Sequence, residues 1–398
     1  MKKYLLQFSF ALVLMSIKAS GQEYIPYYGS IVEQCSQTNI TNNLTAYEAL
    51  GLKRRGTTSL QNTFDWLKNK YLGFGYTASQ IQEDSYTYAG SSAVCKNLVV
   101  TKIGTLYPNT YVIVCGHYDS IGGTGTNDNG SGLVSILETA RLLKNIPTEY
   151  SIKFINFSGE EDGLYGSKHY VNDVVNATSP KMSIRLVINL DEVGGVAGMD
   201  NDTITCERDQ SSNPSTNNAQ SAIMTNELIA CVGLYSPLNT QLSYAYASDY
   251  MSFQSNNEVI TGLFETNETT HKHTNTDLLI YMDPVYNYNV AKATIGAVLH
   301  FARATTSAAL GAEEFDNDYQ VNFFPSPATD SLNISLGSLT ETKYAFSLVD
   351  LQGKVVLNRQ IDNASLIETI ALQHLPRGMY MAVLQTETKK ITKKIIVE

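Results

Sequence analysis

The sequence predicts an open α/β sheet, largely parallel and sandwiched by helices, followed by a small all-β sandwich domain. Up to about residue 300, short apolar runs alternate with stretches of helical periodicity, which is typical of α/β folds with buried strands. Beyond residue 320 the chain changes to short alternating segments separated by turn residues, a pattern typical of antiparallel sandwiches.

The elements of the α/β part follow from the spacing of apolar residues. Residues 22–56 show no clear period, whereas residues 57–72 and 130–144 have the spacing of amphipathic helices. Four-to-eight-residue apolar runs between them predict the strands, which we expect at 97–102, 110–115, 151–157, 185–190 and 259–264.

The C-terminal part begins with a linker. Residues 305–320 are mostly small and polar, and residues 321–398 contain seven short segments of alternating character. We expect strands at 321–324, 331–336, 344–350, 354–360, 368–372, 378–386 and 389–397.

Composition and charge limit the class of protein. The 398 residues are 43% hydrophobic and 17% charged, which is typical of a globular chain large enough for an enzyme. The net charge of −10 argues against a nucleic-acid partner, because no basic surplus is left for phosphates. A metal ion or a protonated amine would suit an acidic site.

The N-terminus predicts export. Met-Lys-Lys is followed by an apolar run over residues 4–17 and then by small residues, so residues 1–21 are expected to be a signal peptide. No later run is long and apolar enough to span a bilayer. In an exported chain the five cysteines predict up to two disulfides, with Cys115 free in a buried strand. The sequence leaves the pairing open, and Cys35–Cys95 with Cys206–Cys231 is the working hypothesis.

Acidic and histidine side chains stand where predicted strands end, or in the loops that follow. They are His117, Asp119, Asp128, Glu160, Glu161, Asp191 and His273. Ligands of an open α/β sheet bind beyond the carboxyl ends of its strands, so we expect these side chains to meet. Imidazoles and carboxylates in this number satisfy two divalent metals that share one bridging group.

Local spacing suggests separate roles within this set. His117 and Asp119 are two apart in an extended segment, so the Asp119 carboxylate can accept a hydrogen bond from the far nitrogen of His117. Asp128 precedes Asn-Gly-Ser-Gly, which opens a helix whose N-terminus favours the ionised aspartate. The adjacent Glu160 and Glu161 diverge, so one can bind a metal while the other acts as a general base.

These motifs resemble, in order, those of the co-catalytic di-zinc exopeptidases, a family of secreted bacterial aminopeptidases with glutamate carboxypeptidase and glutaminyl cyclase relatives. The resemblance covers about residues 90–300, and its stretches are Gly-His-Tyr-Asp-Ser, Asn-Asp-Asn-Gly-Ser-Gly, Ser-Gly-Glu-Glu, Asn-Leu-Asp and His-Thr-Asn-Thr-Asp.

The resemblance implies a role for each residue of the set. Two zinc ions would share Asp128 as the bridging ligand. His117 and Asp191 would hold one zinc ion, and Glu161 and His273 the other. Glu160 would be the general base and Asp119 the residue that orients His117. His271 competes with His273, which we favour because Thr274 and Asp277 follow it in the family spacing.

The resemblance has two departures. Ser-Asp-Tyr at residues 248–250 stands where family members often carry histidine after the aspartate. The tyrosine that assists the reaction in some members has no unambiguous match here, and the candidates are Tyr246 and Tyr244.

Aminopeptidase activity on peptides or proteins is the first expectation. Carboxypeptidase-type and glutaminyl-cyclase-like activities are alternatives. Cyclases of this fold use a single zinc ion, so the presence of both His117 and Asp191 argues against a cyclase. A surface peptide-binding protein without catalysis is the alternative from another class.

The last region resembles the C-terminal sorting module of type IX secretion. The matching stretches are Phe-Pro-Ser-Pro-Ala-Thr-Asp, Val-Asp-Leu-Gln-Gly-Lys, Gly-Met-Tyr and the lysine-rich end. The expected organisation is therefore a signal peptide at 1–21, a peptidase domain at 22–304, a linker at 305–320 and a sorting domain at 321–398. It implies a secreted or cell-surface protein that meets the type IX machinery.

Overall fold

The computed structural model describes residues 22–87, 92–305, 321–325, 327–336, 343–350, 354–362, 367–385 and 390–398. These residues divide into two compact units, one ending at Ala304 and one following it. The expected signal peptide and nearly all of the expected linker lie outside the described residues. No described helix is long and apolar enough to cross a membrane.

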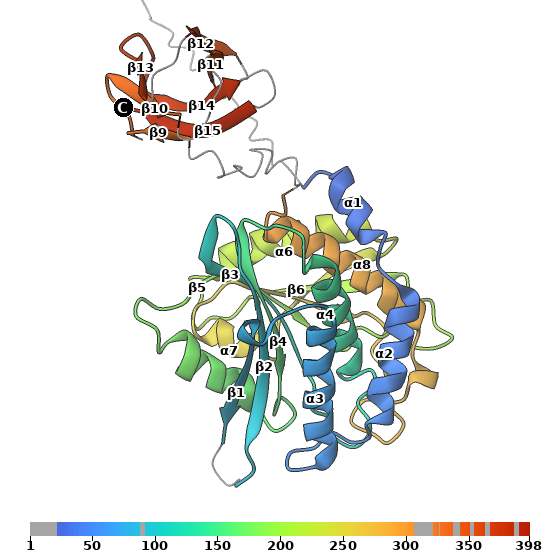
Figure 1. Cartoon of the computed structure of the whole chain (residues 1–398). Helices are drawn as coiled ribbons and strands as arrows, with labels where there is room; N and C mark the ends of the chain where they lie inside the picture. Colours follow the sequence, from blue (N-terminus) through green and yellow to red (C-terminus); the bar gives the residue numbers. More distant parts are fainter. Residues whose placement is uncertain are drawn as a thin grey trace, which may run out of the picture. The chain divides into compact units, whose positions relative to one another are not determined.

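A mixed sheet forms the centre of the first unit (Figure 1). Its strands follow the order β1-β2-β4-β3-β5-β8-β6-β7. The pairs among β4, β3, β5 and β8 are parallel, as is β6 with β7, whereas β1–β2, β2–β4 and β8–β6 are antiparallel. The strands are β1 (Ile81–Tyr86), β2 (Cys95–Lys102), β3 (Tyr107–His117), β4 (Tyr150–Phe157), β5 (Ser183–Leu190), β6 (Thr203–Arg208), β7 (Asn239–Tyr244) and β8 (Ile260–Glu265).

Helices cover both faces of this sheet. On β3, Val112 and Val114 belong to the core shared with α1–α4, α6 and α8, whereas Ile113 and Cys115 belong to a second core with η2 and α7. Alternate side chains of a strand point to opposite faces, so a wholly apolar strand needs both layers. The helices are α1 (Pro26–Val32), α2 (Gln37–Ala49), α3 (Thr58–Gly73), α4 (Gly130–Leu143), α5 (Tyr165–His169), η2 (Tyr170–Val175), α6 (Asn218–Tyr235), α7 (Tyr250–Ser255) and α8 (Pro284–Phe301), with short 3-10 turns η1 (Ala78–Gln80) and η3 (Leu279–Tyr281).

The second unit is all β. One sheet has the order β13-β10-β9 and the other β12-β11-β14-β15, and every pair within them is antiparallel. Apolar side chains of both sheets meet in one core, as expected of a sandwich. The strands are β9 (Asn322–Phe324), β10 (Ser331–Ser335), β11 (Lys343–Val349), β12 (Val355–Asp362), β13 (Ile367–Ala371), β14 (Gly378–Gln385) and β15 (Lys390–Val397).

The predicted fold class is confirmed, with corrections in detail. The sheet is mixed, because β2, β6 and β7 run opposite to the other strands of this sheet. Residues 22–56, which lack a clear period, contain α1 and α2. Ser36 caps α2 by accepting a hydrogen bond from the Asn39 backbone N–H, so this helix is defined by its cap as well as by its buried side chains.

The expected disulfides are wrong. All five cysteines are free and buried, including Cys115, which was expected to be free. Cys206 and Cys231 both pack within the larger core as small apolar groups, and burial raises the pKa of Cys206 to about 12. Their thiols therefore contribute to packing rather than to cross-linking.

Candidate metal centre

The carboxyl ends of three parallel strands bring the predicted residues to one edge of the sheet. His117 ends β3, whose register with β4 pairs it with Phe157, three residues before Glu160. Asp191 directly follows β5. Asp128 stands just before α4, and His273 lies in the loop between β8 and α8. The strand ends thus bring together side chains that are far apart in sequence.

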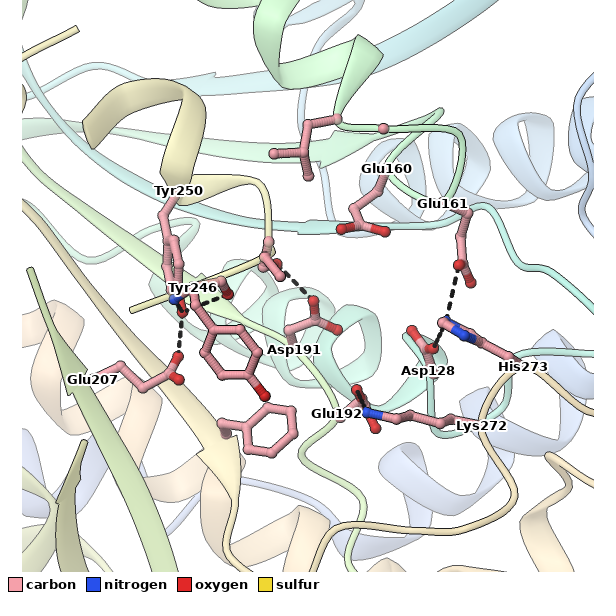
Figure 2. Close-up of a pocket in the computed structure, with 15 residues that line it drawn as sticks. Asp128, Glu160, Glu161, Asp191, Glu192, Glu207, Tyr246, Tyr250, Lys272 and His273 are labelled. Atoms are coloured by element: carbon pink, nitrogen blue, oxygen red, sulfur yellow. Dashed lines mark hydrogen bonds and ion pairs between the residues drawn. The ribbon is translucent and has the colours of Figure 1, made fainter. Parts of the chain in front are cut away.

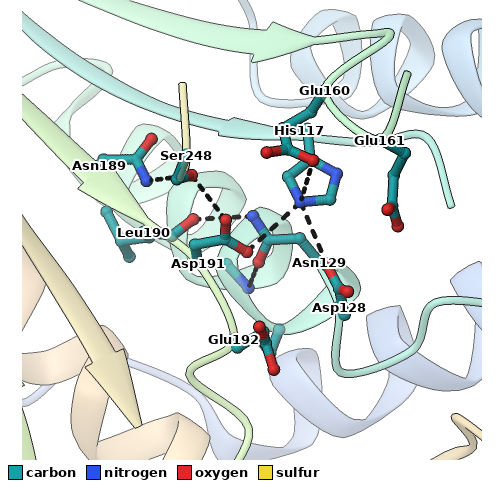
Figure 3. A network of polar contacts seen from close by, with 12 residues as sticks. His117, Asp128, Asn129, Glu160, Glu161, Asn189, Leu190, Asp191, Glu192 and Ser248 are labelled. Carbon is teal, nitrogen blue, oxygen red and sulfur yellow. Dashed lines mark hydrogen bonds and ion pairs between the residues drawn. The ribbon is translucent and has the colours of Figure 1, made fainter. Parts of the chain in front are cut away.

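Asp128 lies between two imidazoles. Its Oδ1 is 3.2 Å from Nε2 of His117, and its Oδ2 is 3.1 Å from Nε2 of His273. On one side, Oδ1 of Asp191 is 3.3 Å from the His117 nitrogen (Figure 3). On the other, Oε2 of Glu161 is 3.1 Å from the His273 nitrogen (Figure 2). The aspartate therefore separates two groups of donors, each with one imidazole and one further carboxylate.

The donor set fits divalent cations. One atom each of His117, Asp128 and Glu161 lies within 4.8 Å of the others. Oε1 of Glu161 and Oδ1 of Asp191 are buried and have no hydrogen bond in the described part of the chain. Burial and the neighbouring Asp128 together raise the pKa of Glu161 to about 8. Such crowded carboxylates can all be ionised only if positive charge is supplied between them.

The two imidazoles, when protonated, supply part of this positive charge. Burial by itself would raise the pKa of Asp128, but hydrogen bonds from His117 and His273 outweigh it and hold the pKa below its ordinary value. Among the described residues, neither imidazole donates a hydrogen bond to Glu160, and burial raises the pKa of Glu160 to about 10. Its Oε2 is 4.0 Å from Nε2 of His117, so it borders the donors without joining either group.

Asp119 differs from the expectation. Nδ1 of His117 is 3.2 Å from the backbone oxygen of Asp119 and 3.7 Å from its carboxylate, so the expected hydrogen bond to the carboxylate is not formed. The carboxylate instead accepts hydrogen bonds from the backbone N–H groups of Glu160 and Glu161, each at 3.3 Å. Asp119 therefore ties the His117 strand to the loop that carries both glutamates.

Further contacts fix the loop of Asp128. The Asp277 carboxylate accepts backbone N–H groups of Asn127 at 2.8 Å and Asp128 at 3.1 Å. Asn129 caps α4 through the N–H of Gly132. A Cβ on Gly132 would lie 2.5 Å from the oxygen of Leu190, so only glycine lets α4 approach β5 this closely.

The two candidate histidines have different surroundings. His273 faces Asp128 and Glu161, as described above. Nδ1 of His271 is 2.8 Å from the hydroxyl of Thr276, and its ring stacks on Tyr281. The structure thus brings His273, and not His271, to the other predicted residues.

A cavity of about 370 Å³ opens beside the donors (Figure 2). Tyr246 lines it, whereas Tyr244, its rival in the sequence, does not. Glu192, Glu207 and Lys272 also line it and were not expected from the sequence. The one sequence signal for Glu207 is an acidic residue inside an otherwise strand-like run, Thr203–Arg208.

Known proteins match both units. Residues 97–298 match the profile described as Peptidase family M28, and residues 322–398 match one described as a secretion system C-terminal sorting domain.

Two curated relatives match shorter segments. Aminopeptidase YwaD of Bacillus subtilis is 45% identical over 84 residues, which cover 21% of this chain and 18% of that protein. Leupeptin-inactivating enzyme 1 of Streptomyces exfoliatus is 34% identical over 148 residues, covering 36% of this chain and 32% of that protein. The chain thus spans less than a third of the length of either relative.

A solved structure shares the fold. The crystal structure of the LapA aminopeptidase of Legionella pneumophila superposes with a TM-score of 0.60 at 20% sequence identity, covering 77% of this chain and 81% of that one. At this identity the likeness concerns the fold alone.

Proposed function

Because this chain belongs to peptidase family M28, we propose that it is a secreted aminopeptidase that uses two zinc ions and a glutamate base to remove N-terminal residues from peptides. The observation that carries the proposal is the position of Asp128, with one imidazole facing each of its carboxylate oxygens. The similarity of one segment to aminopeptidase YwaD supports the same reaction class.

The proposed ligands divide around Asp128. His117 and Asp191 would hold one ion, Glu161 and His273 the other, and Asp128 both. When bound, such ions lower the pKa of water and polarise a carbonyl group. One carboxylate oxygen of Glu161 and one of Asp191 form no hydrogen bond within the described part of the chain. Both oxygens are therefore available as metal ligands.

Glu160 is the proposed general base. Its carboxylate stands next to the donors, takes a proton from the attacking water and returns it to the nitrogen of the leaving amine. Backbone hydrogen bonds to Asp119 hold the peptide that carries it, so the carboxylate has a fixed starting position.

Metal content and substrate choice test the proposal together. We expect about two zinc ions per chain, by the two-metal mechanism, and cleavage of peptides with a free but not an acetylated N-terminus. Glu160→Gln should lower kcat about 10²–10⁴-fold, the contribution of a general base, while metal content stays unchanged. Glu161→Gln, by contrast, should lose both activity and bound metal.

A buried acid outside the site provides the control. Glu258 is 8% exposed and forms an ion pair with Lys181, so Glu258→Gln tests the effect of losing a buried charge elsewhere. Full activity in Glu160→Gln, a metal-free active protein, or equal cleavage of acetylated peptides would contradict the proposal.

The second part of the proposal concerns export. We propose that residues 1–21 are a signal peptide, 22–304 the peptidase domain, 305–320 a linker and 321–398 a sorting domain for type IX secretion. The match of residues 322–398 to a secretion sorting domain supports this division. Deleting residues 321–398 should leave the protein inside the cell, which fractionation of a type IX-competent host would measure.

A further inference from the structure

The cavity beside the proposed metal ligands has a wall that those ligands do not occupy. In Figure 2, Glu207 lies on the far side of Tyr246 from Glu161 and His273. If the scissile bond lies at the metal ligands, this wall faces the side chain of the substrate's N-terminal residue. The chemistry of the wall then determines which residue is removed.

Glu207 is a buried acid without a cationic partner. It comes from β6 and is 4% exposed. Its Oε2 accepts a hydrogen bond from the hydroxyl of Tyr250 at 2.5 Å, and within the described part of the chain no basic side chain forms an ion pair with it. Burying an unpaired carboxylate is costly, so a positive charge entering the cavity would be stabilised there.

Glu192 adds a second acid to the lining of the cavity. It is 7% exposed and adopts a φ of 45°, a conformation that few residues with a side chain adopt. Its Oε1 is 3.1 Å from Nζ of Lys272, and its Oε2 has no hydrogen bond to any described residue. Lys272 also pairs with Glu268, so one ammonium faces two carboxylates and the excess charge is negative.

Aromatic side chains complete the cavity. Tyr246 and Phe264 line it together with Leu164. A long aliphatic chain packs well against such surfaces while its charged end reaches a polar group. A chain of the length of lysine or arginine would thus meet apolar contacts along its stem and carboxylates at its end.

We propose that this cavity selects a basic N-terminal residue, lysine or arginine, with Glu207 and Glu192 as the specificity-determining residues. The inference rests on the proposed aminopeptidase function. Two other uses of the same groups are conceivable from their charges: the acids could bind the α-amino group of every substrate, or Lys272 could bind an acidic side chain.

Norleucine separates these uses, because it has the length of lysine without the ammonium group. The zinc-loaded full-length protein is assayed with lysyl, arginyl, norleucyl and glutamyl p-nitroanilides. We expect kcat/KM for lysine and arginine to exceed that for norleucine by about tenfold or more, as for a buried charge pair. The ratio of lysine to norleucine should fall by about tenfold in Glu207→Gln and also in Glu192→Gln.

Glu258→Gln is the matched control, because it removes a buried acid that does not line the cavity, and the ratio should stay at the wild-type value. Calorimetric binding of lysinamide and norleucinamide to Glu160→Gln adds a readout that needs no turnover, with lysinamide expected to bind more tightly. The wild-type ratio and this binding comparison test the proposal even where a cavity variant fails to fold.

Each contrary outcome has its own meaning. If kcat/KM fell equally for all substrates in Glu207→Gln and Glu192→Gln, the two acids would bind the α-amino group of the substrate. This result would overturn the proposal. Preference for glutamyl substrates would overturn it in favour of Lys272. Cleavage of norleucyl substrates without a lysine preference would overturn the inference alone. No cleavage of any aminoacyl substrate would overturn the aminopeptidase function, and the inference with it.

Discussion

The hydroxyl of Ser248 donates a hydrogen bond to Oδ2 of Asp191 over 2.6 Å, and Oδ1 of the same carboxylate has no hydrogen bond to any residue that the structure describes. Ser248 in turn accepts a hydrogen bond from the side-chain amide of Asn189 at 2.8 Å. One oxygen is therefore held by the protein while the other is left for a ligand. Ser248 and Asn189 thus orient the Asp191 carboxylate, at the end of β5, as a proposed metal ligand.

Ser248→Ala should weaken metal binding. The alanine cannot hold Oδ2 of Asp191, and loss of such a supporting contact lowers metal affinity or activity about 10- to 100-fold. Zinc titration with a competing chelator measures the affinity. Ser252→Ala is the control, because that serine is also buried but its hydroxyl pairs with Ser167. Equal zinc affinity in Ser248→Ala and the wild type would show that Ser248 does not orient Asp191.

Asp277→Ala should destabilise the first unit. Two backbone N–H groups, of Asn127 and Asp128, would lose their acceptor, and each unsatisfied buried group costs about 1–3 kcal/mol. Urea unfolding followed by the fluorescence of Trp66, the single tryptophan of the chain, measures the loss. Asp173→Ala, in which a side chain that is 67% exposed is removed, should change the free energy of unfolding by less than about 0.5 kcal/mol.

Five free thiols are expected in the folded protein. Because all five are buried, a thiol reagent should modify them slowly in the native protein and completely in denaturant. Mass spectrometry after alkylation without reductant counts the modified cysteines. A mass lower by two hydrogens, or labelling that requires a reductant, would indicate a disulfide that the structure lacks.

Sequence patterns predicted the parts of the fold with strong periodicity. The apolar runs that became β3, β4, β5 and β8 are buried on both faces, so their residue types are constrained at every position. β7 escaped prediction because it lies at the edge of the sheet and carries exposed side chains such as Leu242 and Tyr244. α2 escaped because its buried positions include Asn43 and Tyr47 beside apolar residues.

The candidate site was predictable to the extent that its residues follow strands. His117, Glu160 and Asp191 each stand at or just after a strand end, where the sequence alone places a ligand. Ser248 lies in the Ser-Asp-Tyr segment where the sequence departs from the family, and Glu207 lies in a strand outside the motifs. Only tertiary contacts reveal that Ser248 holds Asp191 and that Glu207 lines the cavity. The hydrogen bond of His117 to the backbone oxygen, rather than to the carboxylate, of Asp119 likewise depends on local geometry that spacing cannot supply.

His300 makes the stability of the first unit dependent on pH. It is 9% exposed, its Nε2 is 2.8 Å from the hydroxyl of Tyr235, and burial lowers its pKa to about 4. The neutral imidazole is therefore the form that the fold stabilises. This contribution is fully present above the unfolded pKa of about 6.5 and is lost as the pH falls towards the folded value.

Between pH 7 and pH 5 the free energy of unfolding should fall by about 1–2 kcal/mol more in the wild type than in His300→Gln. This figure takes about 1.36 kcal/mol per pKa unit and is reduced because solvent reaches part of the imidazole. Glutamine cannot titrate but can still accept a hydrogen bond from Tyr235, so the packing is largely kept. Urea unfolding at both pH values, followed by Trp66 fluorescence in excess chelator, isolates this difference from acid release of metal. Identical pH dependence in the two proteins would mean that His300 is protonated in the fold as readily as in the unfolded chain.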